Sequence, residues 1–354
     1  ICTFLSGGVD SSVVSAVCAA ELKKQGKKLT TFSFDFIDND KYFKANSFQP
    51  SQDRPYVDKM VSFLDSDHHY LECDNKMQAD LLYRSVDAHD LPCMADIDSS
   101  LQYFCEEVSH SHKVVLTGEC ADEVFGGYPW FHREEMLNSG TFPWTPSLTP
   151  RKVLLKDDLV KSLHMDEYVK KIYDRSVSEI NVLPSENEIE TNRRRIGYLN
   201  IRFFMQTLLN RMDRTSMFSG LEARVPFADR KLVDYVFNIP WEMKAKDGLV
   251  KNILRQASKG LLPDEILFRR KSPYPKTYNP YYENLLAKRL KEVLSDSASP
   301  LHSLLDLKQV TQFLENPKDY GSPWYGQLMA GPQMIAYLLQ IEYFLRKYNV
   351  SIRI

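Results

Sequence analysis

Two glycine-containing segments of this sequence carry the acidic and hydroxyl side chains that bind phosphate and divalent cations. The first follows an apolar run and precedes a helical pattern, and it reads Ser6, Gly7, Gly8, Val9, Asp10, Ser11 and Ser12. Glycines let backbone N–H groups approach an anion, and the first turn of a helix adds further unpaired N–H groups. Asp10 would repel phosphate unless a hard cation such as Mg²⁺ lies between them. The segment therefore predicts a nucleotide-phosphate loop with a metal ligand.

The second segment spans residues 117–128 and follows another apolar run. It contains the glycines Gly118, Gly126 and Gly127 and the carboxylates Glu119, Asp122 and Glu123. These carboxylates could hold Mg²⁺. One of them, crowded by the others and by phosphate, would have a raised pKa and could accept a proton from an amine. A plain acidic turn that caps a helix is the alternative interpretation.

Both segments are expected at the same edge of a parallel sheet. Short apolar runs predict strands at 1–5, 29–36, 69–72 and 113–117, and helical patterns lie between them at 11–24, 56–64, 81–88 and 101–109. Such alternation predicts an α/β fold, a doubly wound parallel sheet covered by helices on both faces. Ligands of these folds bind at the carboxyl ends of the strands, where both segments are expected.

The remainder of the chain is expected to be mostly helical. Residues 1–130 are predicted to form the nucleotide-binding part, residues 131–150 a proline-containing linker, and residues 151–354 a helical part. Apolar stripes with helical spacing predict the following helices: 196–212, 230–237, 249–257, 281–294 and 332–348.

Composition narrows the class of protein. The 354 residues are 43% hydrophobic and carry a net charge of −2, so charge gives no reason to expect binding to nucleic acid or membranes. No apolar run reaches the roughly 20 residues of a membrane span. The six cysteines are scattered, which is typical of reduced thiols in a cytoplasmic protein. The chain opens on an apolar strand without Met, and we expect that sequence upstream of it is missing.

The first segment is similar to the PP-loop of the ATP pyrophosphatases. In that family the loop holds the β,γ-pyrophosphate while ATP is split between its α and β phosphates. The segment lacks the Lys of a Walker A loop, so cleavage at the γ-phosphate is disfavoured. A glycine turn that caps a helix is the structural alternative.

The second segment resembles the S/T-G-E-G-x-D-E-x-F-G-G-Y stretch of asparagine synthetases, with Cys120 in place of a glycine. The resemblance implies a catalytic role for Glu119 in ammonia attack and a role for Asp122 in binding Mg²⁺–pyrophosphate, with Asp10 as the other metal ligand. It also implies contacts with ATP from several further residues: Leu5, Phe34, Thr117 and Gly118, beside Ser6–Ser12.

Three later segments agree with this resemblance. Residues 248–255 match G-x-x-K-x-I-L-R, which makes Lys251, expected on a helix, a cation for the phosphates. Residues 209–227 match a family run that could equally be a salt-bridge corner formed by Asp213, Glu222 and Arg224. The stretch 90–100 resembles D-x-P-x-x-D-S-S but lacks the arginine found there in some relatives.

The expected function is therefore ATP-dependent amidation of aspartate by ammonia through β-aspartyl-AMP, with ATP and Mg²⁺ as cofactors. Amidation of a different carboxylate and a non-catalytic ATP-binding domain are the alternatives. Glutamine-dependent members carry a separate glutaminase domain with an N-terminal Cys nucleophile. Cys2 lies within a predicted strand and is interpreted as a buried thiol, so the partner expected is an upstream glutaminase domain of the same polypeptide. A homodimer is left open.

Overall fold

The computed structural model describes residues 1–45, 49–317, 323–324, 327–328 and 330–353. The chain forms two compact units, each assembled from three separate segments. The first comprises Ile1–Asp74, Leu101–Phe131 and Asn200–Asn279, and the second comprises Asn75–Ser100, His132–Leu199 and Pro280–Ile354. Neither unit is therefore a single stretch of sequence.

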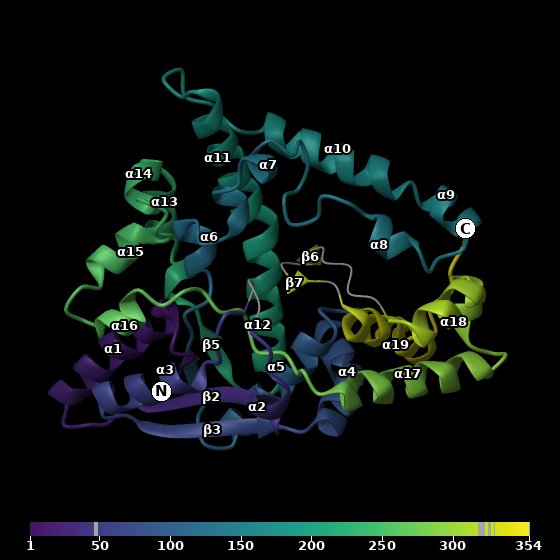
Figure 1. Ribbon diagram of the computed structural model, residues 1–354, viewed down its shortest axis with the longest axis horizontal. Coiled ribbons are helices and arrows are strands. Elements are labelled where there is room, and N and C mark those ends of the chain that lie inside the picture. The colour runs from purple at the N-terminus through teal and green to yellow at the C-terminus, as the bar shows by residue number, and fades with distance from the viewer. Residues whose placement is uncertain (46–48, 318–322, 325–326, 329, 354) are drawn as a thin grey trace. The chain divides into compact units, whose positions relative to one another are not determined.

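A parallel sheet forms the centre of the first unit (Figure 1), with the strand order β3-β2-β1-β4-β5. The strands are β1 (Cys2–Phe4), β2 (Thr30–Phe36), β3 (Asp67–Cys73), β4 (Val114–Leu116) and β5 (Glu222–Arg224). All four pairings are parallel. The α/β prediction with an all-parallel sheet is confirmed.

Helices surround this sheet in the first unit. They are α1 (Val9–Lys24), α2 (Asn39–Tyr42), α3 (Arg54–Leu64), α6 (Ala121–Phe125), α12 (Gln206–Phe218), α13 (Arg230–Phe237), α14 (Trp241–Lys244), α15 (Asn252–Ala257) and α16 (Asp264–Leu267). Shorter or irregular turns are η1 (Pro129–Phe131), the π-helical η2 (Asn200–Met205) and η3 (Pro226–Ala228). The helix α5 (Asp96–Ser109) begins in the second unit and continues into the first.

Side chains of β1 and of the residue that follows it alternate between two layers of core. Cys2 and Phe4 pack in a cluster that includes Phe104 of α5, whereas Leu5 packs with Val57 of α3. On the face of Leu5, the hydroxyl of Thr3 lies 2.7 Å from that of Ser15 in α1. Successive side chains of a strand point to opposite faces, so helices cover both faces of the sheet.

Successive strands are added on one side of β1 first and on its other side from β4 onward. From β1 the chain proceeds outward through β2 to β3, and it then returns to the other side of β1 with β4 and β5. Ligands of open parallel sheets bind where the strand order reverses, at the carboxyl ends. The segments 6–12 and 117–128 follow β1 and β4, so both lie at this point.

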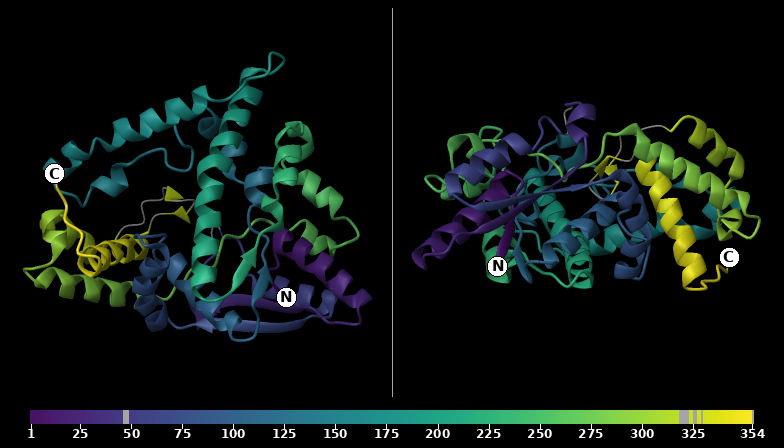
Figure 2. Two further views of the ribbon diagram at one scale, coloured as in Figure 1. Left: turned by 180° about the vertical axis from the view of Figure 1, so that it is seen from behind. Right: turned by 90° about the horizontal axis from the view of Figure 1, so that it is seen from below.

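The second unit is mostly helical. It contains α4 (Asn75–His89), α7 (Glu134–Leu137), α8 (Thr149–Lys152), α9 (Asp157–Leu163), α10 (Met165–Ser178), α11 (Glu188–Leu199), α17 (Pro280–Ser295), η4 (Pro300–Ser303), α18 (Leu307–Glu315), β6 (Pro323–Trp324), β7 (Gln327–Leu328) and α19 (Gly331–Lys347). Figure 2 shows α4, α17 and α19 side by side, and their apolar faces share one core. Among the described residues, no helix is both long enough and apolar enough to cross a membrane.

Candidate active site

The loop after β1 is held by its own hydroxyl groups. The backbone N–H of Ser6 donates to the Ser11 hydroxyl at 3.1 Å, and the Ser11 hydroxyl donates to the carbonyl of Gly8 at 3.3 Å. The helix α1 starts directly after Gly8, so its first N–H groups lie in the loop. The hydroxyl of Ser12 is buried and has no hydrogen-bond partner among the described residues. The loop therefore combines helix N–H groups with an unsatisfied buried hydroxyl, which fits an anion.

The loops after β1 and β4 approach each other so closely that glycine is required. A Cβ on Gly118 would overlap the backbone of Asp10 and Ser11, and a Cβ on Gly127 would lie 2.6 Å from Cε of Lys251 and overlap the carboxylate of Asp122. Any side chain at these positions would move the acidic and basic groups of the site.

The ammonium group of Lys251 lies between two carboxylates. Its Nζ is 2.5 Å from Oδ2 of Asp10 and 2.6 Å from Oδ1 of Asp122, and the side chain is only 2% exposed. The other oxygen of Asp122 forms an ion pair with Lys271. The structure thus brings the predicted residues Asp10, Asp122 and Lys251 together and adds Lys271.

The pKa values of Asp10, Asp122 and Lys251 depend on one another. Burial opposes ionisation of Asp122, but Lys251 and Lys271 outweigh it and hold the pKa of Asp122 below its usual range. Burial lowers the pKa of Lys251, and the two carboxylates more than offset this and raise it. Burial and the nearby charge of Asp122 raise the pKa of Asp10, although Lys251 and Lys271 act in the opposite direction. At neutral pH, Asp122 and Lys251 are therefore both ionised.

The expectation that Lys251 lies on a helix is wrong by one residue. Lys251 immediately precedes α15 and has φ +54°, a left-handed backbone conformation that is rare for residues other than glycine. The buried ion pairs with Asp10 and Asp122 hold the side chain and offset the backbone cost. Tertiary contacts, which a helical sequence pattern does not report, therefore determine this conformation.

The predicted catalytic residue Glu119 is held by an arginine. A guanidinium N–H of Arg211 donates to Oε1 of Glu119 at 2.5 Å, and both side chains are largely buried. Arg211 belongs to α12 and lies within the run 209–227 that resembles the family. The sequence of that run points instead to Asp213, Glu222 and Arg224. These three are exposed or partly exposed, and Glu222 and Arg224 pair with each other on the surface. Arg211 shares a helix face with Leu208 and Thr215, three residues before it and four after it, and this spacing was the available signal.

A second carboxylate of the acidic segment, that of Glu123, has a raised pKa. Burial and the neighbouring Asp122 raise the pKa of Glu123 to about 7. The hydroxyl of Tyr128 donates to Oε1 of Glu123 at 2.5 Å, and the Tyr128 ring stacks on Trp130. The sequence predicted one carboxylate with a raised pKa in this segment, and the structure gives that property to Glu123.

Two buried arginines donate hydrogen bonds to backbone carbonyl groups of the site's loops. Arg269 donates to the carbonyl of Ser6 at 2.9 Å and to Asp53 at 2.6 Å, and its guanidinium lies 3.9 Å from the centre of the Tyr56 ring. Arg255 donates to the carbonyl of Val250 at 2.8 Å and thereby fixes the backbone next to Lys251. Sequence reasoning missed Arg269 as a contact of the phosphate loop.

The remaining predicted contacts with ATP lie along the same edge. Leu5 is buried and its N–H donates to the carbonyl of Phe32 at 2.8 Å. Phe32 pairs with Phe4, the last residue of β1. Phe34 lies two residues further along β2 and is therefore beside the start of the loop. Its ring packs in an aromatic cluster. Thr117 is buried, and its hydroxyl accepts from the N–H of Glu119 at 3.3 Å.

Asp10 and Asp122 fit a hard cation. Both side chains are largely buried, and Oδ1 of Asp10 has no hydrogen-bond partner among the described residues. Mg²⁺ prefers carboxylate oxygens and is usually held by one or two of them together with phosphate oxygens. These two residues would hold it.

Two cysteines have structural explanations. Cys2 is fully buried in β1, and burial raises its pKa to about 12, so its thiol is not a nucleophile at neutral pH. Cys120 has φ +70°, the left-handed conformation that favours glycine. This left-handed backbone conformation explains why the family has a glycine at this position.

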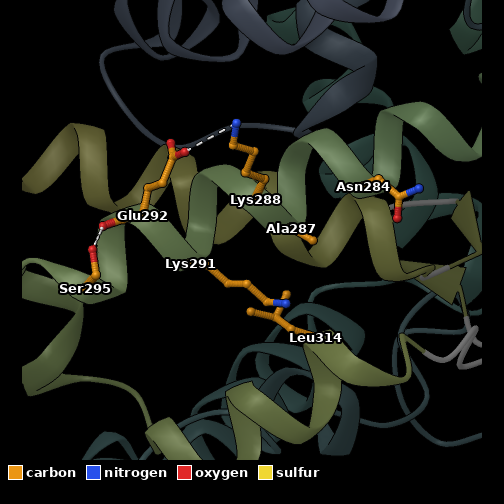
Figure 3. A pocket seen from close by; sticks show the side chains of 7 residues that line it. All are labelled: Asn284, Ala287, Lys288, Lys291, Glu292, Ser295 and Leu314. Carbon is orange, nitrogen blue, oxygen red and sulfur yellow. Dashed lines mark hydrogen bonds and ion pairs between the residues drawn. The ribbon is translucent and has the colours of Figure 1, made fainter.

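A surface hollow on the second unit (Figure 3) carries none of the predicted site residues. It is lined by residues of α17 and by Leu314 of α18. Lys288 and Glu292 form a long surface ion pair of 3.9 Å there. The residues predicted to bind ATP all belong to the first unit.

Comparison with known proteins agrees with this geometry. The family model described as asparagine synthase matches residues 1–346. The chain belongs to the asparagine synthase family. It is 48% identical over 99% of its length to "Asparagine synthetase [glutamine-hydrolyzing] 3" of Bacillus subtilis, covering 57% of that protein. It is also 27% identical to "Amidase chyE" of Penicillium rubens, over 77% of the chain and 49% of that protein. A third relative is "Asparagine synthetase [glutamine-hydrolyzing]" of Rattus norvegicus, 26% identical over 76% of the chain and 38% of that protein. The chain thus spans about half the length, or less, of these relatives.

Proposed function

We propose that this chain is the ATP-using part of an asparagine synthetase, a carbon–nitrogen ligase that forms AMP and diphosphate. The observation that carries the proposal is the meeting of Asp10, Asp122 and Lys251 at the point where the strand order reverses. The strand, loop and helix formed by β1, Ser6–Ser12 and α1 further support a PP-loop fold of the adenine-nucleotide alpha-hydrolase type.

In the first step, an oxygen of the β-carboxylate of aspartate attacks the α-phosphorus of ATP, and pyrophosphate leaves. The products are β-aspartyl-AMP and pyrophosphate. Lys251 and Lys271 offset the negative charge that builds on the leaving group, and Ser12 and the first N–H groups of α1 donate to it. Mg²⁺ held by Asp10 and Asp122 would supply further positive charge.

In the second step, the nitrogen of ammonia attacks the β-carbonyl carbon, and AMP leaves with the electron pair of the carbon–oxygen bond. The attacking nitrogen loses a proton as the amide of asparagine forms. Glu119, oriented by Arg211, is the proposed acceptor of that proton. Thr117 and Gly118 shape the approach to it.

The test is pyrophosphate release from ATP with aspartate and an ammonium salt, followed by mass spectrometry of the product. We expect pyrophosphate, AMP and asparagine in equal amounts, and Glu119→Ala should retain ATP binding while losing asparagine formation. A chain that binds ATP but releases no pyrophosphate with any carboxylate would contradict the proposal.

A second candidate is amidation of a different carboxylate by the same chemistry. Asparagine synthesis is the better supported of the two, because the relative with 48% identity carries that name. Pyrophosphate release with another acid and none with aspartate would select it.

For the whole protein, we propose that ammonia comes from a glutaminase part of the same polypeptide in the cytoplasm. The names of the asparagine synthetase relatives include glutamine hydrolysis and support this. We expect the present chain alone to use ammonium salts but not glutamine, and glutamine-driven asparagine formation by it would refute this.

A further inference from the structure

The second unit contains a buried cluster of three side chains with different donor atoms. His89 is the last residue of α4, Cys93 lies in the following turn, and Asp98 lies in the first turn of α5. One ligand atom from each lies within 4.8 Å of the other two. Donors around one zinc ion stand roughly 3–4 Å apart, because each bond is about 2.0–2.3 Å long. The three atoms therefore need to close by only about 1 Å to share a cation.

The hydrogen bonding of His89 fixes which nitrogen can bind a metal. Its Nδ1 lies 2.9 Å from the backbone carbonyl of Ser85. A carbonyl only accepts, so Nδ1 carries the proton, and the neutral ring has its lone pair on Nε2. Histidine ligands are usually held in this way, with one nitrogen donating to a carbonyl or carboxylate and the other bound to the metal.

Asp98 is a fully buried carboxylate with one unsatisfied oxygen. Its exposure is 0%, and Oδ2 accepts the backbone N–H of Met94 at 2.5 Å. Oδ1 is buried and has no hydrogen-bond partner among the described residues. A buried carboxylate oxygen without a partner is costly, and a cation in the cluster would satisfy it.

Cys93 is held in place by a glutamine of α19. The N–H of Cys93 donates to Oε1 of Gln340 at 3.1 Å, and Nε2 of Gln340 donates to the sulfur at 3.2 Å. Gln340 is itself fully buried. An N–H group directed at the sulfur stabilises a thiolate ligand from outside the coordination sphere.

We propose that His89, Cys93 and Asp98 bind a zinc-class divalent cation that fastens the turn between α4 and α5. The mixed nitrogen, sulfur and oxygen donors suit Zn²⁺ or Co²⁺ and exclude Mg²⁺, which prefers six oxygen ligands. The site is distinct from the residues proposed for ATP, and its test does not depend on catalysis. Without a cation, the same residues would be a purely hydrogen-bonded network, which is the competing explanation.

The experiment is a Co²⁺ titration of the chelator-treated chain, followed by displacement with Zn²⁺. A thiolate ligand gives a sulfur-to-cobalt charge-transfer absorption. We expect this absorption in the unaltered chain, its loss in Cys93→Ser, and its retention in Asp98→Asn with a weaker affinity for Zn²⁺, because one ligand is lost. Cys18→Ser, which removes another partly buried thiol, is the matched control and should bind like the unaltered chain.

Thermal unfolding gives an independent measurement. Zn²⁺ should raise the unfolding midpoint of the unaltered chain and of Cys18→Ser but not of Cys93→Ser, and excess Mg²⁺ should not replace it. The proposal is overturned if the unaltered chain shows no charge-transfer absorption, since this needs no variant to fold. Weak binding shared equally by every variant would show adventitious metal only and would also overturn it.

Discussion

Replacement of Lys251 by methionine tests the central ion pairs most directly. The ammonium is 2% exposed and lies 2.5 Å from Asp10 and 2.6 Å from Asp122. Asp122 would keep its ion pair with Lys271, whereas Asp10 has no other ion pair among the described residues. Removing one partner of a buried ion pair costs about 3–5 kcal/mol because a buried charge is left uncompensated. We therefore expect the free energy of unfolding to fall by that amount, mainly through Asp10.

The loss should depend on pH. Burial and Asp122 already raise the pKa of Asp10, and Lys251→Met removes the group that lowers it. A carboxyl group whose pKa is higher in the folded than in the unfolded state stabilises the folded state at low pH and loses this contribution as pH rises. The deficit of Lys251→Met should therefore shrink as pH falls, and Asp10→Asn in the same chain should recover a large part of it at mildly alkaline pH.

Urea unfolding followed by circular dichroism measures these differences. Lys231→Met, at an exposed lysine of α13, is the control and should change the free energy of unfolding by less than about 0.5 kcal/mol. Pyrophosphate release should be lost in Lys251→Met and kept in Lys231→Met. A loss of stability below about 1 kcal/mol, or one that Asp10→Asn does not reduce, would show that the two side chains are not paired in the folded protein.

Three further predictions concern the neighbours of this cluster. Arg211→Met should leave ATP binding intact but lower asparagine formation about 10- to 100-fold because Glu119 loses its orientation, and Arg211→Lys should restore part of it; equal loss of ATP binding and amidation would contradict this. The pKa of Glu123 is raised from 4.5 to about 7. Ionisation of this group therefore destabilises the folded state by about 3 kcal/mol as pH rises through this range. Glu123→Gln removes the ionisable group and should flatten the pH dependence of the urea midpoint. Gly127→Ala should cost more than about 1 kcal/mol and abolish pyrophosphate release, because the added methyl overlaps Asp122; a fully active variant would refute the close approach.

Much of the first unit was predictable because its strands and helices have strong local signals. The apolar runs at 1–5, 29–36 and 113–117 became β1, β2 and β4, and the glycines and Asp10 fell at the expected strand end. By contrast, β5 was missed. Its three residues include charged Glu222 and Arg224, and only backbone pairing with β4 makes them a strand.

The sequence indicated several residues of the candidate site but not how they pair. Short motifs indicated Glu119, Asp122 and Lys251. Arg211 and Arg269, by contrast, lie far along the chain from the loops they contact. The sequence likewise could not indicate that Glu123 would have the raised pKa, because that depends on burial and on the distribution of lysines around Asp122.

The sequence by itself determined the loop Ser6–Ser12, the acidic segment and the alternation of strands and helices, because glycine content, charge and periodicity act over a few residues. Only the tertiary structure decided that Lys251 lies between Asp10 and Asp122 in a left-handed conformation, and that His89, Cys93 and Asp98 converge. Such contacts depend on how distant or turning segments pack, and the energy of a buried charge is set by its surroundings rather than by its neighbours in sequence.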